Sequence, residues 1–155
     1  EGLAFVPEER AVVRDLSVAD NLKLARADQS LAFELFPELA GLASRRAGLL
    51  SGGEQQMLTL ARALGRRPTV LLADELSLGL APMLVQRLLR AIRSAADDGV
   101  GVILVEQYAR QALEIADRVY VLRRGRVVLE GSADELRRDF GRVEQAYLAA
   151  GEPGT

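Results

Sequence analysis

Two short apolar runs near the middle of the chain constrain the fold most. Residues 69–73 read Thr-Val-Leu-Leu-Ala, and residues 100–105 read Val-Gly-Val-Ile-Leu-Val. Neither run alternates polar with apolar side chains, so each predicts a strand that is buried on both faces. Pro82 lies between them and begins an amphipathic pattern that predicts a helix over 82–97. Strand, helix and strand in this order predict an α/β fold with a mostly parallel sheet and crossover helices.

The flanking sequence predicts further elements. Residues 3–6 form an apolar run that Pro7 ends, which predicts another strand. Capping residues and apolar spacing predict helices over 18–27 behind Ser17, within 28–49, after Ser51, over 109–116, after Ser132 and over 141–149, with a hairpin turning at Arg124-Gly125 and a tail over 151–155. We expect three parts: a strand and loop over 1–13, an α-helical subdomain over 14–65, and an α/β subdomain over 66–155 that ends in the hairpin and helices.

Composition excludes several classes of chemistry. The chain has no Cys and no His, which excludes disulfides, thiolate metal sites, Ser-His-Asp triads and an imidazole base. Lys23 is the sole lysine and no glycine precedes it, so these residues contain no GxxxxGK[ST] phosphate loop. The net charge of −2 gives no basic field for nucleic acid. The apolar runs are far shorter than the ~18 residues of a membrane span. Since Glu1 directly precedes a predicted strand, we expect the true N-terminus to lie upstream.

The first chemical signal is Leu50-Ser51-Gly52-Gly53-Glu54. One interpretation is a capping box, in which Ser51 caps a helix and Glu54 reaches back to it. The other is an anion site, because a helix N-terminus with bare glycine backbone and a hydroxyl suits phosphate. Capping explains the serine and the glutamate but not two glycines, each of which costs a helix ~1 kcal/mol. We therefore favour close approach of a phosphate ligand.

The second signal is Asp74-Glu75 at the end of the predicted strand. In open α/β sheets, ligands bind at the carboxyl ends of the strands. Asp74 can hold Mg²⁺ through oxygen, and Glu75 can orient or deprotonate an attacking water. The alternative is an ordinary acidic loop before the next helix.

Together these two segments resemble the signature motif and Walker B motif of ABC-type ATPases. Ser77-Leu78-Gly79-Leu80-Ala81-Pro82 resembles the D-loop, Glu106-Gln107 falls at the switch, and Pro7-Glu8 falls at the Q-loop. The resemblance spans nearly the whole chain and implies a partial P-loop NTPase fold, running from the Q-loop to the C-terminus. The strings VPEER, LSGGEQQMLTLARAL and LVEQYARQALEIADRVYVL are similar to the second ATPase subunit of branched-chain amino-acid importers. Importers of urea and short amides share this general pattern.

The resemblance implies ATP and Mg²⁺ as cofactors and assigns roles to individual residues. Asp74 and Glu8 would serve the metal, Glu75 would polarise water and Gln107 would contact the γ-phosphate. The residues of the signature that would bind nucleotide in trans are Ser51, Gly52, Gly53 and Glu54. The partners implied are a second ABC ATPase subunit and transmembrane permease subunits, with the protein cytoplasmic and peripheral on the inner face of the cell membrane. No nucleic-acid partner is expected.

Departures from the family pattern keep other functions open. Leu76 replaces a proline, and we expect it to loosen the turn that aims Glu75. Without a phosphate loop, we expect the chain alone not to hydrolyse ATP at a normal rate, and to expose an open sheet edge and an apolar face. The alternatives are a non-transport ABC ATPase and a non-catalytic regulatory module.

Overall fold

The central element of the fold is a three-stranded sheet in which every strand is parallel. The computed structural model describes residues 2–148, which fall into two compact units, up to Gln107 and from Tyr108 onward. In the first unit, strands β1 (Leu3–Val6), β2 (Val70–Asp74) and β3 (Gly101–Val105) pair in the order β1-β2-β3. Helix α5 (Pro82–Asp97) makes the crossover between β2 and β3. The predicted α/β fold with a parallel sheet is confirmed.

Only one face of this sheet is covered. The buried face carries Ala4, Val6, Leu71 and Ala73. On the opposite face Leu3, Phe5, Ile103 and Val105 are each more than half exposed, and strand pairing places them beside Val70, Leu72 and Asp74. Helix α4 (Gly52–Leu64) contacts β1, α5 contacts β3, and the two helices contact each other.

The prediction that both apolar runs are buried on two faces is therefore wrong for these residues. β2 alternates half-buried with buried residues, and β3 alternates exposed with half-buried ones. The physical reason is that the helices of this unit cover a single face of the sheet. The expected uncovered apolar face is present.

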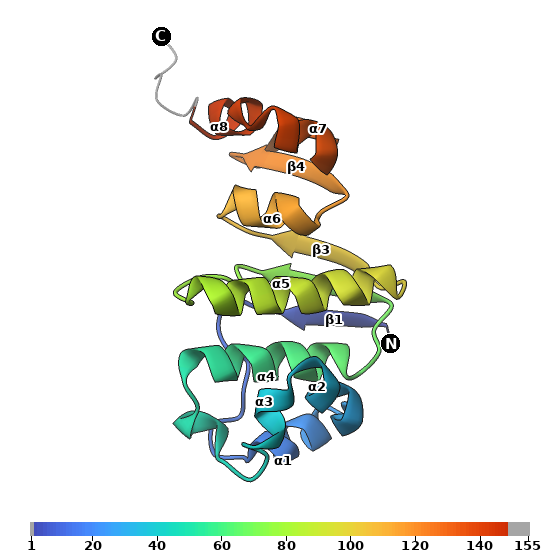
Figure 1. The fold of residues 1–155 in the computed structure, drawn as a ribbon, viewed down its shortest axis with the longest axis vertical. Helices are drawn as coiled ribbons and strands as arrows, with labels where there is room; N and C mark the ends of the chain where they lie inside the picture. Colours follow the sequence, from blue (N-terminus) through green and yellow to red (C-terminus); the bar gives the residue numbers. More distant parts are fainter. Residues whose placement is uncertain (1, 149–155) are drawn as a thin grey trace. The chain divides into compact units, whose positions relative to one another are not determined.

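A layer of short helices packs on the other side of α4 (Figure 1). These are α1 (Val18–Leu24), α2 (Gln29–Leu35), α3 (Pro37–Ala40) and the 3₁₀ turn η1 (Ala47–Leu49). Ser17 caps α1 by accepting the Asp20 N–H, as predicted, although the helix ends at Leu24 rather than at residue 27. Residues on all sides of α4 are buried, because the helix lies between β1 and this layer.

The second unit is a hairpin packed with three helices. It contains α6 (Ala109–Ile115), β4 (Arg118–Arg123), β5 (Arg126–Ser132), α7 (Ala133–Arg138) and α8 (Phe140–Leu148). Arg124 and Gly125 turn the hairpin with φ of 48° and 76°, as a type I′ turn requires. Ser132 and Glu135 form the predicted capping box. The hairpin and helices are confirmed, and the predicted tail over 151–155 lies outside the described residues.

The structure divides the chain into two units, one up to Gln107 and one from Tyr108 onward. This is a different division from the predicted one into 1–13, 14–65 and 66–155, which stays a prediction. No helix within residues 2–148 combines the length and apolarity needed to cross a membrane.

Candidate functional site

The carboxyl edge of the sheet gathers the residues that the sequence singled out on separate strands. Glu8 follows β1, Glu75 follows β2, and Gln107 follows β3. The three strands run parallel and in register, with Val6 beside Ala73 and Asp74 beside Val105. Their following turns therefore lie at one edge, where α/β sheets bind ligands.

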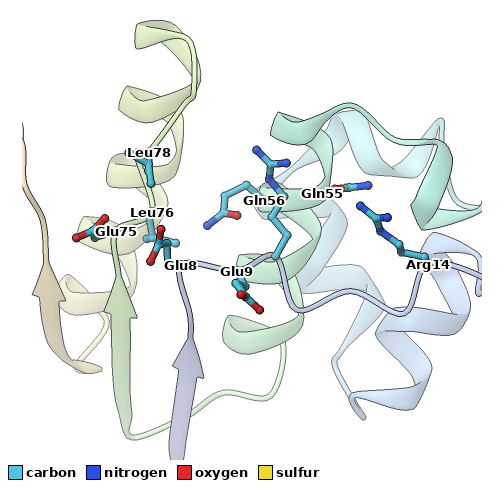
Figure 2. Close-up of a pocket in the computed structure, with 9 residues that line it drawn as sticks. Glu8, Glu9, Arg14, Gln55, Gln56, Glu75, Leu76 and Leu78 are labelled. Carbon is cyan, nitrogen blue, oxygen red and sulfur yellow. The ribbon is translucent and has the colours of Figure 1, made fainter.

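A pocket of about 360 Å³ opens at this edge and brings two of the predicted carboxylates together. Glu8 and Glu75 both line it, and Gln56 reaches from α4 toward the turn of Glu8 (Figure 2). The remaining lining residues are Glu9, Arg10, Arg14, Gln55, Leu76 and Leu78. Predicted residues outside the lining are Ser51, Gly52, Gly53, Glu54, Asp74 and Gln107.

Gln56 is the pocket residue that sequence reasoning missed and that matters most. Its side chain is 3% exposed, and its Nε2 is buried without a hydrogen-bond partner among residues 2–148. The neighbouring Gln55 instead donates to the Ala47 carbonyl at 2.9 Å. A buried donor without an acceptor costs ~1–3 kcal/mol, so the lining of the pocket contains one unsatisfied donor. Its place in the signature string was the only sequence signal for this role.

The start of α4 is a complete capping box. Ser51 Oγ accepts the Glu54 N–H at 3.3 Å, and Glu54 Oε2 accepts the Ser51 N–H at 2.7 Å. The capping interpretation of these two residues is therefore confirmed. It leaves the hydroxyl hydrogen of Ser51 available to a ligand oxygen, so capping and phosphate binding are compatible.

The chain's own side chains supply a reason for both glycines. A Cβ on Gly52 would lie 2.7 Å from the Arg10 guanidinium, and one on Gly53 would collide with Leu84 of α5. Packing of α4 beside Arg10 and α5 is thus a second reason for bare backbone at this position. Close approach of a phosphate ligand stays a prediction.

The turn that carries Glu75 is firmly held. Glu75 has φ of 46°, a left-handed conformation that is uncommon outside glycine, and its N–H donates to the Val105 carbonyl at 2.9 Å. Leu76 is 2% exposed. Its side chain packs in the interior where a proline ring would fix φ, and the expected loosening of the turn by Leu76 stays a prediction.

The loop of Glu8 is anchored at its far end by two buried or half-buried polar side chains. Asn21 is fully buried; its Oδ1 accepts the Val13 N–H and its Nδ2 donates to the Val13 carbonyl, both at 2.9 Å. Arg62 of α4 donates to the Ala11 carbonyl, and burial lowers the pKa of its guanidinium. Glu8, Glu9 and Arg10 thus lie between fixed points at Val6 and Ala11.

The acidic residues fit Mg²⁺ better than a metal held by protein alone. Residues 2–148 contain no group of three or more Asp and Glu side chains placed to hold an ion. Mg²⁺ takes one or two carboxylates and fills its other positions with water and phosphate oxygens. Glu8 lines the pocket and Asp74 does not, so Asp74 and Glu8 as the donors to Mg²⁺ stay a prediction.

Comparisons with solved structures show which fold the chain has. The chain is similar to a structure of an ATP-binding subunit of an ABC transporter, with 24% identity and a TM-score of 0.81, covering 97% of this chain and 69% of that one. It is also similar in fold to an ATP-binding cassette of an ABC transporter in its ADP conformation, with 22% identity, a TM-score of 0.78 and coverage of 97% and 69%. The fold is that of an ABC ATPase cassette.

Sequence comparisons establish the family. Residues 1–77 match the ABC transporter family model. The high-affinity branched-chain amino acid transport ATP-binding protein BraG of Pseudomonas aeruginosa is 43% identical, over 96% of this chain and 67% of its own length. The probable branched-chain amino acid transport ATP-binding protein LivF of Archaeoglobus fulgidus is 40% identical, over 87% and 61%. The lipopolysaccharide export system ATP-binding protein LptB of Acidithiobacillus ferridurans is 35% identical, over 95% and 65%. The chain belongs to the ABC transporter family of ATP-binding proteins and spans about two thirds of the length of these relatives.

Proposed function

We propose that this chain forms the Q-loop-to-C-terminus part of an ATP-hydrolysing subunit that energises an importer of branched-chain amino acids. The observation that carries the proposal is the pocket at the carboxyl edge of the sheet, where Glu8 and Glu75 lie together beside the signature helix α4. A phosphate loop supplied by a segment outside residues 1–155 completes the nucleotide site.

In this proposal Glu75 accepts a proton from the attacking water, as a carboxylate at the reacting centre can. Gln107 donates a hydrogen bond to the γ-phosphate, and being an amide it carries no proton for acid–base chemistry. Asp74 and Glu8 hold Mg²⁺, which when bound offsets the charge of the phosphates. The Ser51 hydroxyl and the first N–H groups of α4 donate to the γ-phosphate of ATP bound by a partner subunit.

The partners follow from that arrangement. A signature motif that acts in trans needs a second ATPase subunit, and a dimeric structure of a bacterial ABC transporter cassette shows 22% identity and a TM-score of 0.74 to this chain. We propose that transmembrane permease subunits hold the pair at the inner face of the cell membrane. Loss of the γ-phosphate then releases the dimer and resets the transporter.

The substrate proposal follows the names of the relatives. Two branched-chain amino acid proteins are 43% and 40% identical to this chain, against 35% for the lipopolysaccharide exporter. The test is uptake of radiolabelled leucine by Pseudomonas aeruginosa that lacks BraG and expresses the full-length protein containing this chain. Restored uptake that is lost with Glu75→Gln supports the proposal. Uptake that stays absent, with export restored in cells depleted of LptB, contradicts the substrate.

A second candidate that the sequence leaves open is a non-catalytic regulatory module. Lys23 is the sole lysine, so residues 1–155 hold no phosphate loop. The sequence upstream of Glu1 separates the two. A GxxxxGK[ST] loop there supports the ATPase. Its absence from the full-length protein supports the regulatory module.

A further inference from the structure

A carboxylate from the turn after β3 holds the turn after β2. Glu106 Oε1 accepts the backbone N–H of Ser77 at 3.1 Å, and Glu106 Oε2 accepts the Ser77 hydroxyl. Both carboxylate oxygens are thus used on one residue that lies 29 positions earlier in the chain. Ser77 is 5% exposed and Glu106 is half-buried. Hydrogen bonds to an ionised acceptor at such a site are about twice as strong as neutral ones.

This contact lies immediately beside the strained residue of the site. Glu75, two positions before Ser77, has φ of 46°. A non-glycine residue in this region costs ~1–3 kcal/mol and persists only where its surroundings hold it. The Val105 carbonyl accepts the N–H of Glu75 at 2.9 Å, and the Glu106 carboxylate accepts the N–H of Ser77 at 3.1 Å. The last residue of β3 and the residue that follows it therefore hold both sides of the Glu75 turn.

The same contact joins the two turns that carry Glu75 and Gln107. Gln107 directly follows Glu106, and Glu75 lies two residues before Ser77. Leu76 lies between Glu75 and Ser77, at the position where the family pattern has proline, so the φ restraint of a proline ring is missing. The Glu106 carboxylate supplies a restraint from the neighbouring strand instead.

We propose that Glu106 is a positioning residue that holds the Glu75 turn through Ser77 and sets its spacing to Gln107. This inference rests on the proposed ATPase function. It assigns a role to a side chain that touches neither nucleotide nor metal in that function.

The test compares three variants of the full-length protein in an ATP hydrolysis assay. Glu106→Gln keeps the size of the side chain but loses its charge, Ser77→Ala removes the hydroxyl, and Glu34→Gln is an exposed matched control. We expect Glu106→Gln and Ser77→Ala each to lower kcat about tenfold, with KM for ATP within twofold of wild type. The double variant should be no slower than the slower single variant, because both changes remove one contact.

Several outcomes overturn the inference. One is an unchanged kcat in Glu106→Gln. Another is a lower melting temperature of Glu106→Gln with full kcat, which would mean that the contact has a structural role alone. A third is additive losses of kcat in the double variant. If the wild type hydrolyses no ATP, the proposed function fails, and amide exchange decides the contact itself. Glu106→Ala should then speed exchange of the Ser77 N–H at least tenfold. An unchanged exchange rate would contradict the proposed hydrogen bond between Glu106 and Ser77.

Discussion

At the scale of single residues, the start of α4 has one role that the contacts show and a second that we propose. Ser51 and Glu54 complete each other as a capping box, which is sufficient reason for their presence. The proposed role in phosphate binding uses the hydroxyl hydrogen that capping leaves free. The two roles can be separated because asparagine caps helices as well as serine does.

We predict that Ser51→Asn leaves the stability of the protein within ~0.5 kcal/mol of wild type, whereas Ser51→Ala lowers it by ~1 kcal/mol. Both variants should lower ATP hydrolysis by the full-length protein, since neither carries the hydroxyl. Denaturant unfolding and phosphate release measure the two effects. Full activity in Ser51→Ala would show that the capping box alone accounts for this residue.

At the scale of elements, the anchoring of the Glu8 loop depends on α1. Asn21 is fully buried, and its side-chain amide makes four hydrogen bonds, to the N–H and carbonyl of Val13 and to the carbonyls of Leu16 and Ser17. The three carbonyls also accept the backbone N–H groups of Leu16, Ala47 and Asn21. Removing the amide therefore leaves the Val13 N–H without its acceptor, at ~1–3 kcal/mol. The loop then loses its fixed point next to α1.

We predict that Asn21→Ala destabilises the protein by ~1–3 kcal/mol and speeds tryptic cleavage after Arg10 and Arg14, which are exposed in this loop. The matched control is Ser17→Ala on the same helix, which should cost only ~1 kcal/mol and leave cleavage unchanged. Equal cleavage rates for Asn21→Ala and wild type would contradict the anchoring role.

Elements defined by nearby residues could be predicted from the sequence. Both capping boxes, the Arg124-Gly125 turn and the crossover helix α5 depend on residues within a few positions of one another. The burial of β3 could not, because an apolar pattern reports what side chains favour and not which elements are there to cover them. Two further features depend on contacts between distant segments, so no local pattern predicts them. They are the hydrogen bonds between Glu106 and Ser77 and the buried Gln56 Nε2 without a partner.

At the scale of the molecule, the main feature is the face of the sheet whose apolar side chains remain exposed. Leu3, Phe5 and Ile103 are 59%, 58% and 59% exposed on one face, on the two strands that flank β2. Among the described residues, β1 and β3 are the outer strands of this sheet, and each has one edge that pairs with no other strand. Exposed apolar sheet surface with free edges favours association between chains.

We predict that the 155-residue chain self-associates, and that Phe5→Thr with Ile103→Thr reduces this while keeping residues that suit a strand. Light scattering and binding of a hydrophobic dye measure the effect. Met83→Gln removes a side chain that is 83% exposed on α5 and serves as the control, with no expected change. A monomeric wild-type chain with a cooperative melt would contradict the prediction.

The central claim is that these residues hold the reacting carboxylate of an ATPase but not its phosphate loop. Phosphate release from ATP tests it most directly, comparing the 155-residue chain with a chimera that joins the preceding segment of BraG to it. The chain alone should release no phosphate above background. The chimera should release it steadily, and Glu75→Gln should slow the chimera about 100-fold or more. Release by the chain alone at the rate of the chimera, or full activity of the Glu75→Gln chimera, would contradict the account.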